Sequence, residues 1–482
     1  MSTKAFQIYE HTIPSSHIRE YPRATAGDQE DVLQLAVKQY TPHEPLTGKT
    51  TVTVIGAHAN GFPKELYEPL WDELYEALKA KGIAISNIFI ADVAHQGASG
   101  VLNERKLGND PSWMDHPRDL FLMVNHFRKE MKRPIIGIGH SMGGNNLVNL
   151  SLMHPRLFTT LIMMDPVIQR IPSREGNFGP AQASTKRRDR WPSRAAAEAG
   201  FKRSKFYQTW DPRVLDLWVK FGLRELPTHL YPSATPGSAS ASSPTADGAA
   251  ATASATGNTE KEVTLATSKH HEVFSFLRPN FVTEEYPSPS TQPNPITHPD
   301  VDPAAAPNSP FYRPEPINTF HKLPNVRPSV YYIFGDQSFL SAPVLKADKL
   351  AQTGIGVGGS GGVKKGRVDH VTFEGVGHLI PMEVVGQTAD ACGSWLAPEI
   401  ERWRSIEDAE RHEWAAVPIE EKGKLRFFIE LQAGGIGFAV AAVGEVLVIL
   451  VMLLLLSSSV CVDRDLAHAV WVKVAIPAIA VY

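Results

Sequence analysis

Pro134-Ile135-Ile136-Gly137-Ile138-Gly139-His140-Ser141-Met142-Gly143 is the stretch that decides the fold this sequence predicts. Its first five residues are short and apolar, as in a buried strand. Residues 144–153 then place Leu147, Leu150 and Met153 on one helix face. Between them stands a G-x-S-x-G pentapeptide, whose glycines allow a tight turn. Strand, sharp turn and helix together predict a nucleophile elbow that holds the Ser141 hydroxyl at its tip.

The same alternation of short apolar runs and helical patterns continues on both sides of this stretch. The expected strands are Phe6–Ile8, Val32–Tyr40, Thr51–Gly56, Asn87–Ala91, Thr160–Met164, Val330–Phe334 and Val368–Phe373. The expected helices cover residues 65–80, 116–131, 345–351 and 381–395. This rhythm predicts an α/β protein with a mostly parallel central sheet flanked by helices.

The rhythm breaks between residues 167 and 326, which predicts a large cap insertion. The expected organisation is a first core part at 1–166, the insertion at 167–326, a second core part at 327–431 and a hydrophobic tail at 432–482. One helix is expected within the insertion, over residues 193–221. Residues 232–257 are almost all Ser, Ala, Thr, Pro and Gly, so we predict that this tract is disordered.

Composition excludes several classes of protein. The formal net charge is −3, which gives no overall basic field to attract nucleic acid. Two distant cysteines, Cys392 and Cys461, make no disulfide framework, so a reducing compartment is expected. The first residues lack the apolar run of a signal peptide, which favours an intracellular location.

Three residues with complementary chemistry each follow a predicted strand. Ser141, Asp336 and His378 occur in that order along the chain. A serine needs an imidazole to take its proton and a carboxylate to orient the imidazole. Strand ends of a parallel sheet meet at one edge, so we expect Ser141, Asp336 and His378 to form a catalytic triad. Asp165 also ends a strand and is the alternative acid, although Asp-Pro is typical of a strand-terminating turn.

These motifs resemble those of the α/β-hydrolase superfamily. They are Gly139–Gly144 at the serine, Gly335-Asp336 after the penultimate strand, Gly377–Glu383 around the histidine, Asp92–Ser99 and His58–Gly61. His95 and Ala59 are departures from the usual pattern in the last two motifs. Leu107-Gly108 with residues 113–120 is more narrowly similar to fungal hydrolases of the peroxisomal-lipase and host-toxin-biosynthesis group.

The resemblance implies a serine hydrolase acting on an ester, thioester or lipid acyl bond. The oxyanion hole is then expected from the backbone N–H groups of Met142 and Asn60. No cofactor is implied, and His270-His271 has no partner at metal-ligand spacing, so no metal is expected. The alternative function is a fold relative that binds a ligand or partner without catalysis. Epoxide or haloalkane hydrolysis is disfavoured because those enzymes have Asp where Ser141 stands.

The C-terminal tail carries a separate prediction. Residues 436–458 are apolar enough for a transmembrane helix, which needs about 20 such residues. As a membrane helix, this segment would anchor the hydrolase by its C-terminus. The other interpretation is a gene-model artefact past about Leu431, with the enzyme cytoplasmic or, by the family resemblance, peroxisomal. Peroxisomal members carry a Ser-Lys-Leu-like end, whereas this chain ends Ala-Val-Tyr.

Overall fold

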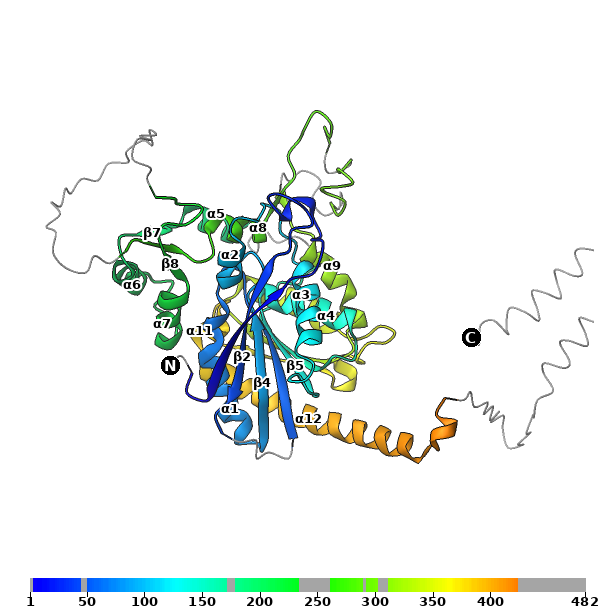
Figure 1. Ribbon diagram of the computed structural model, residues 1–482. Helices are drawn as coiled ribbons and strands as arrows, with labels where there is room; N and C mark the ends of the chain where they lie inside the picture. The colour runs from blue at the N-terminus through cyan, green and yellow to red at the C-terminus, as the bar shows by residue number, and fades with distance from the viewer. Residues whose placement is uncertain are drawn as a thin grey trace, which may run out of the picture. The chain divides into compact units, whose positions relative to one another are not determined.

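A computed structural model describes residues 3–44, 50–170, 178–233, 261–288, 292–301 and 311–423. The chain divides into two units, Met1–Asp408 and Ala409–Tyr482, and the strands among the described residues lie in the first. Its centre is a twisted eight-stranded sheet (Figure 1). In spatial order the strands are β1 (Phe6–Pro14), β2 (Gln34–Pro42), β4 (Ile83–Ala91), β3 (Thr50–Ala57), β5 (Ile135–His140), β6 (Phe158–Met164), β12 (Ser329–Gly335) and β13 (Val368–Phe373).

The sheet is parallel except at one edge. Strand β2 runs antiparallel to both β1 and β4, and every neighbouring pair from β4 to β13 is parallel. Parallel strands are connected through helices that cover the sheet faces. The predicted α/β-hydrolase fold with a mostly parallel sheet is therefore confirmed.

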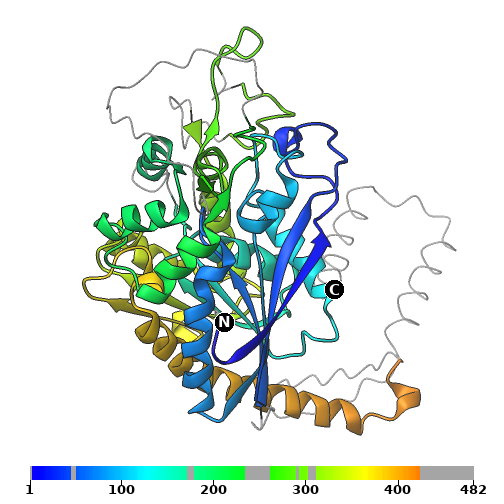
Figure 2. The same cartoon turned by 60° about the vertical axis from the view of Figure 1, so that its left-hand side comes forward.

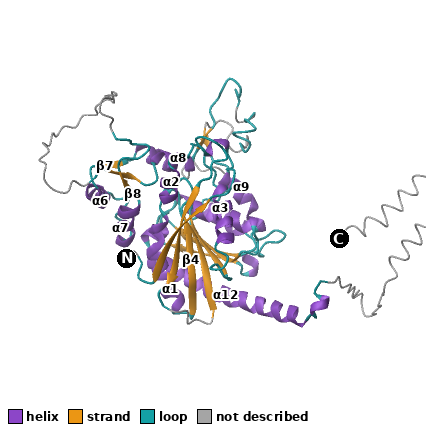
Figure 3. Cartoon of the chain, in the orientation of Figure 1, coloured by secondary structure: helices purple, strands orange, loops and turns teal. Residues whose placement is uncertain are grey.

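Helices cover both faces of the sheet (Figures 2 and 3). One apolar cluster joins the sheet to α1 (Glu68–Lys79), α7 (Pro212–Phe221), α11 (Ile380–Glu383) and the first half of α12 (Val385–Ala416). The other joins it to α3 (Asp115–His126), α4 (Met142–Met153) and α9 (Glu315–Lys322). Leu70, Leu74 and Leu78, spaced one helical turn apart, are fully buried, which is why α1 packs on the sheet.

The chain between β6 and β12 adds no strand to this sheet in its described part. It forms α5 (Gly179–Lys186), β7 (Arg190–Trp191), α6 (Arg194–Arg203), α7, β8 (Leu223–Glu225), β9 (Val263–Leu265), α8 (Lys269–Phe276), β10 (Arg278–Pro279) and β11 (Phe311–Tyr312), before α9. The single helix expected over 193–221 is wrong in its middle. Asp211 caps a new helix by accepting from the Arg213 N–H, and Pro212 fixes its first turn.

Shorter helices complete the described chain. They are η1 (Pro22–Ala24), η2 (Lys64–Tyr67), α2 (Gly97–Asn103), η4 (Leu323–Asn325), η5 (Phe339–Ser341), α10 (Pro343–Gln352), η6 (Val363–Lys365) and η7 (Ile419–Glu421). None of the helices in the described part of the chain is long and apolar enough to cross a membrane. The predicted membrane helix at 436–458 lies outside the described residues. So does the predicted disordered tract, apart from residues 232 and 233.

The turn after β5 fits against the end of β3 without room for a side chain. A Cβ atom on Gly143 would lie 2.1 Å from the carbonyl oxygen of Ala57. That oxygen belongs to the backbone of a central strand, so it cannot move aside. Glycine at position 143 therefore lets α4 begin directly beside the loop that follows β3.

A buried hydrogen-bond chain ties three strand-end loops together. His140 Nε2 lies 2.9 Å from the carbonyl oxygen of His378, which can only accept, so this nitrogen carries the proton. His140 Nδ1 then accepts from the Tyr67 hydroxyl at 3.0 Å. The Tyr67 oxygen in turn accepts from the Ala59 N–H at 2.9 Å. Neutral His140 thus links the loops after β3, β5 and β13.

The close approach at Gly143 generates a stability prediction. Gly143→Ala should lower the free energy of unfolding by about 1–3 kcal/mol or more, because the added methyl group overpacks a rigid site. The matched control is Gly386→Ala in α12, where an added Cβ meets nothing within 4 Å. Replacing that glycine should be neutral or stabilising by about 0.5–1 kcal/mol. Urea denaturation measures both, and equal midpoints for the two variants would contradict the packing argument.

The buried His140 generates a pH prediction. Burial lowers the pKa of His140 to about 3. Below about pH 6.5 the histidine is protonated in the unfolded chain but stays neutral in the folded protein. The free energy of unfolding therefore falls as the pH is lowered from about 6.5 towards 3. Between pH 7 and pH 5 this single group should cost the folded state about 2 kcal/mol. Urea denaturation of wild type and His140→Gln at both pH values should show the smaller loss in the variant. Equal losses would show that His140 is protonated in the folded protein.

Candidate active site

Ser141 lies in a strained turn between β5 and α4. Its φ of 57° and ψ of −117° place a non-glycine residue where side chains are rarely tolerated. The strain is held by packing on both sides, since Gly143 abuts Ala57 and a Cβ on Gly144 would lie 2.7 Å from Pro166. Strained backbone of this kind is common where a side chain must be aimed at a ligand.

The imidazole of His378 bridges Ser141 and a carboxylate. His378 Nε2 is 2.9 Å from Ser141 Oγ, and His378 Nδ1 is 2.6 Å from Asp165 Oδ2. An ionised carboxylate can only accept, so Nδ1 carries the proton and Nε2 is free to accept the serine proton. Asp165 is almost fully buried, whereas the His378 side chain is 22% exposed. This is the geometry of a nucleophile, a base and an orienting acid.

The acid partner of His378 corrects the sequence-based assignment, which favoured Asp336. Asp336 is exposed, and its backbone N–H donates to the Phe373 carbonyl at 3.0 Å. β6 and β12 are neighbouring parallel strands, so Asp165 and Asp336 both stand at the same sheet edge. Strand order alone could not choose between them. The turn at Asp165, with φ of 42°, brings that carboxylate to the imidazole.

The loop after β12 holds the acid instead of supplying it. The hydroxyls of Ser338 and Ser341 both donate to Asp165, Ser341 to Oδ1 at 2.6 Å. Burial raises the pKa of Asp165, but the bond and charge of His378 and the two hydroxyls outweigh burial, and the net pKa is below its usual value. Asp165 therefore stays ionised and keeps accepting from His378.

A buried lysine lies beneath the same loop. Lys349 is 1% exposed, and its Nζ approaches the carbonyl oxygens of Leu345 at 3.3 Å and Leu340 at 3.4 Å. Burial lowers the pKa of Lys349 to about 8, although Asp165 acts in the opposite direction. Its ammonium group and Asp165 thus both contact the turn that carries Ser338 and Ser341.

In the loop after β3, the backbone N–H group of Asn60 differs from those of its two neighbours in its hydrogen bonding. The Ala59 N–H donates to Tyr67, and the Gly61 N–H donates to Gln96 Oε1 at 2.8 Å. The Asn60 N–H has no partner among the described residues. Met142 is the first residue of α4, where helices leave their N–H groups unpaired. Asn60 and Met142 therefore remain the two candidate oxyanion donors.

The Asn60 side chain has a structural role that the sequence did not reveal. Its Nδ2 donates to the Glu272 carbonyl oxygen at 3.0 Å, and its Oδ1 accepts from Gln96 Nε2 at 2.6 Å. Gln96 Nε2 also donates to Ser275 Oγ at 2.9 Å. Helix α8 of the insertion is thereby fixed to the candidate oxyanion loop. Gln96 lies in a motif that the sequence analysis singled out, but nothing there pointed to Glu272 or Ser275.

The part of the chain that the structure describes contains no group of His, Cys, Asp and Glu side chains arranged to hold a metal ion. His271, considered as a ligand from sequence, instead interacts through Nε2 with the Gly108 carbonyl oxygen at 3.2 Å and through Nδ1 with Ser268 Oγ at 3.0 Å. Its two ring nitrogens are thus both occupied by structural hydrogen bonds.

Comparison with known proteins agrees with this fold. A family model described as "Serine aminopeptidase, S33" matches residues 69–214. The type I acyl-CoA thioesterase mpaH of Penicillium roqueforti is 45% identical over 435 residues, covering 89% of this chain and 95% of that protein. The corresponding mpaH' of Penicillium brevicompactum is 44% identical over 412 residues, covering 84% and 91%.

Among solved structures, the peroxisomal alpha-beta-hydrolase Lpx1 of Saccharomyces cerevisiae is similar in fold. The two share 16% sequence identity with a TM-score of 0.58, over 86% of this chain and all of that one. The protein is therefore a hydrolase of the α/β-hydrolase superfamily and belongs to the same family as the Penicillium type I acyl-CoA thioesterases.

Proposed function

We propose that this hydrolase cleaves the thioester bond of an acyl-CoA, with Ser141 as the nucleophile. The observation that carries the proposal is the His378 imidazole, which bonds to Ser141 Oγ and Asp165 Oδ2 at once. The choice of a CoA thioester rests on the relatives that are 44–45% identical over most of their length. Acylation of a serine by ester or thioester substrates uses the same residues, so substrate class is decided outside the triad.

In the proposed first half-reaction, Ser141 Oγ attacks the thioester carbonyl carbon while His378 Nε2 takes the serine proton. Asp165 stabilises the imidazolium that forms and keeps Nδ1 protonated. The negative charge on the carbonyl oxygen is bound by the N–H groups of Met142 and Asn60. Collapse of the tetrahedral intermediate breaks the carbon–sulfur bond, and the imidazolium gives its proton to the departing thiolate, which leaves as the thiol. Ser141 is left acylated.

In the second half-reaction, water takes the place of the thiol. The water oxygen attacks the acyl-enzyme carbonyl carbon while His378 accepts a proton from the water. The same oxyanion donors bind the negative charge on the carbonyl oxygen. The proton then passes to Ser141 Oγ as the ester bond breaks, releasing the carboxylic acid. No cofactor takes part in either half-reaction.

The intracellular location and the C-terminal membrane helix stay predictions from the sequence.

The function is tested with a chain-length panel of acyl-CoA thioesters and matched oxygen esters, following thiol or alcohol release. Wild type should hydrolyse at least one CoA thioester. Ser141→Ala and His378→Ala should each lower kcat by about 10⁴-fold or more, and the double variant should be little worse, because such residues act as a unit. A fluorophosphonate probe should label wild type but not Ser141→Ala. Multiplying losses in the double variant would contradict the shared role.

The acid is tested by two matched substitutions at neighbouring strand ends. Asp165→Asn should lower kcat by about 10⁴-fold, because an amide cannot hold the His378 tautomer that accepts the serine proton. Asp336→Asn should stay within about twofold of wild type, because its side chain is exposed and His378 Nδ1 bonds to Asp165 instead. Steady-state kinetics of both folded variants gives the ranking, and the reverse order would return the acid to Asp336.

A further inference from the structure

A groove of about 740 Å³ lies between the insertion and the core, and the proposed reaction does not use it. Three parts of the chain line it: residues 23–26 beside η1, residues 95–109 around α2, and insertion residues 224–230 and 266–274. These segments are far apart in sequence and all belong to the first unit of the chain.

The groove carries an excess of positive charge. Its lining includes the guanidinium groups of Arg23, Arg105 and Arg224, but Glu104 is its one carboxylate. Glu104 already pairs with Arg224 at 2.6 Å. Arg23 and Arg105 are exposed, and neither has an ion pair among the described residues. The Arg224 Nε atom is buried without a hydrogen-bond partner in the same set. Guanidinium groups without carboxylate partners are suited to bind phosphate.

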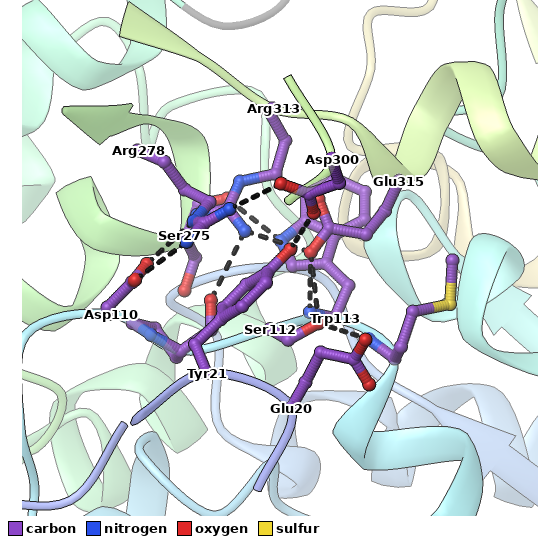
Figure 4. Close-up of polar contacts among 12 residues, drawn as sticks. Glu20, Tyr21, Asp110, Ser112, Trp113, Ser275, Arg278, Asp300, Arg313 and Glu315 are labelled. Atoms are coloured by element: carbon purple, nitrogen blue, oxygen red, sulfur yellow. Dashed lines mark hydrogen bonds and ion pairs between the residues drawn. The ribbon is translucent and has the colours of Figure 1, made fainter. Parts of the chain in front are cut away.

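A buried polar network joins Asp110 and Trp113, which follow the groove residues 95–109, to Ser275 and Arg278 (Figure 4). Arg278 makes two bonds to Asp110, at 2.7 and 2.8 Å, and its guanidinium stacks on the Tyr21 ring at 3.4 Å. The Trp113 indole donates to the Ser275 carbonyl oxygen at 2.8 Å. These contacts join α8 to Trp113 and β10 to Asp110. They also engage the Asp110 carboxylate, which would otherwise repel an anion.

Two consecutive residues, His95 and Gln96, connect the groove to the candidate oxyanion loop. His95 lines the groove, and its Nε2 lies 2.7 Å from Ser275 Oγ. The next residue, Gln96, binds the Asn60 side chain and the Gly61 N–H. The groove wall and the candidate oxyanion loop are therefore connected through His95 and Gln96. Ser141 is not among the residues that line the groove.

We propose that this groove binds the phosphate groups of the CoA moiety of the thioester substrate. The inference rests on the proposed acyl-CoA thioesterase activity and adds the part of the protein that recognises the carrier. A flexible pantetheine arm separates these phosphates from the thioester sulfur. Their binding site must accordingly lie apart from the nucleophile. The groove residues 95–109 follow β4, whose carboxyl end lies at the same edge of the parallel sheet as Ser141 after β5.

The test replaces the two unpaired arginines in Arg23→Glu/Arg105→Glu and compares one acyl group on two carriers. The carriers are CoA and N-acetylcysteamine, which gives the same thioester without phosphate. KM for the CoA thioester should rise roughly tenfold or more with little change in kcat. Kinetics with the N-acetylcysteamine thioester should not change. Arg23→Lys/Arg105→Lys should retain most of the CoA affinity, because it keeps both charges.

A matched control keeps the net charge change but leaves the groove intact. Arg128→Glu/Arg203→Glu alters two exposed arginines outside the groove lining and should leave KM for both carriers near wild type. Thermal melts confirm that each variant folds. An unchanged KM for the CoA thioester in folded Arg23→Glu/Arg105→Glu overturns the inference. An equal rise in KM in the control pair also overturns it, because general charge would then explain the effect.

Adenosine 3′,5′-diphosphate, the nucleotide end of CoA, identifies the source of the phosphate. It should compete with the CoA thioester, leave N-acetylcysteamine thioester hydrolysis unaffected, and bind more weakly to Arg23→Glu/Arg105→Glu. Inhibition of hydrolysis on both carriers, without competition, would mark a regulatory nucleotide site and overturn the inference. If wild type cleaves neither thioester, the proposed function itself fails. If wild type cleaves the CoA thioester and the N-acetylcysteamine thioester with equal KM, the phosphate-binding role of the groove is refuted and the proposed function stands.

Discussion

The imidazole of His378 must reach Ser141 and Asp165 at the same time, and the surrounding structure depends on that constraint. Two short hydrogen bonds, 2.9 and 2.6 Å, require three loops after three different strands to converge within one side chain's span. A parallel sheet brings its strand ends to one edge but does not fix the loops to this accuracy. The buried chain from the His378 carbonyl through His140 and Tyr67 to the candidate oxyanion loop supplies that precision.

The acid in this site is shared between two strands. β6 provides the carboxylate of Asp165, while the turn after β12 provides the hydroxyls of Ser338 and Ser341 that keep it ionised and immobile. The strand end at Asp336 therefore retains a supporting role although its own carboxylate faces solvent. The carboxylate and the hydroxyls that donate to it come from two adjacent strands. This is possible because β6 and β12 are parallel, so their carboxyl ends lie side by side at one edge of the sheet.

The insertion makes hydrogen bonds to residues of the candidate active site. Helix α8 bonds to the Asn60 side chain and to Gln96. Its Glu272 side chain packs against Gly61, where an added Cβ would lie 2.8 Å from Glu272 Cδ. Glu272 is in turn held by Arg187 and by Ser184 of α5. The insertion is thus in direct contact with the loop that carries the candidate oxyanion donor. The same helix forms one wall of the basic groove.

The parallel sheet, the elbow at Ser141 and the candidate histidine His378 could be predicted from the amino-acid sequence, because they follow from local rules. Apolar periodicity, a tight glycine turn and chain order need no knowledge of distant contacts. The choice between Asp165 and Asp336, and the contact of α8 with Asn60, became visible in the folded protein alone. Both outcomes depend on which loops meet across the sheet edge. Sequence spacing carries no record of that, since the partners are separated by more than 200 residues.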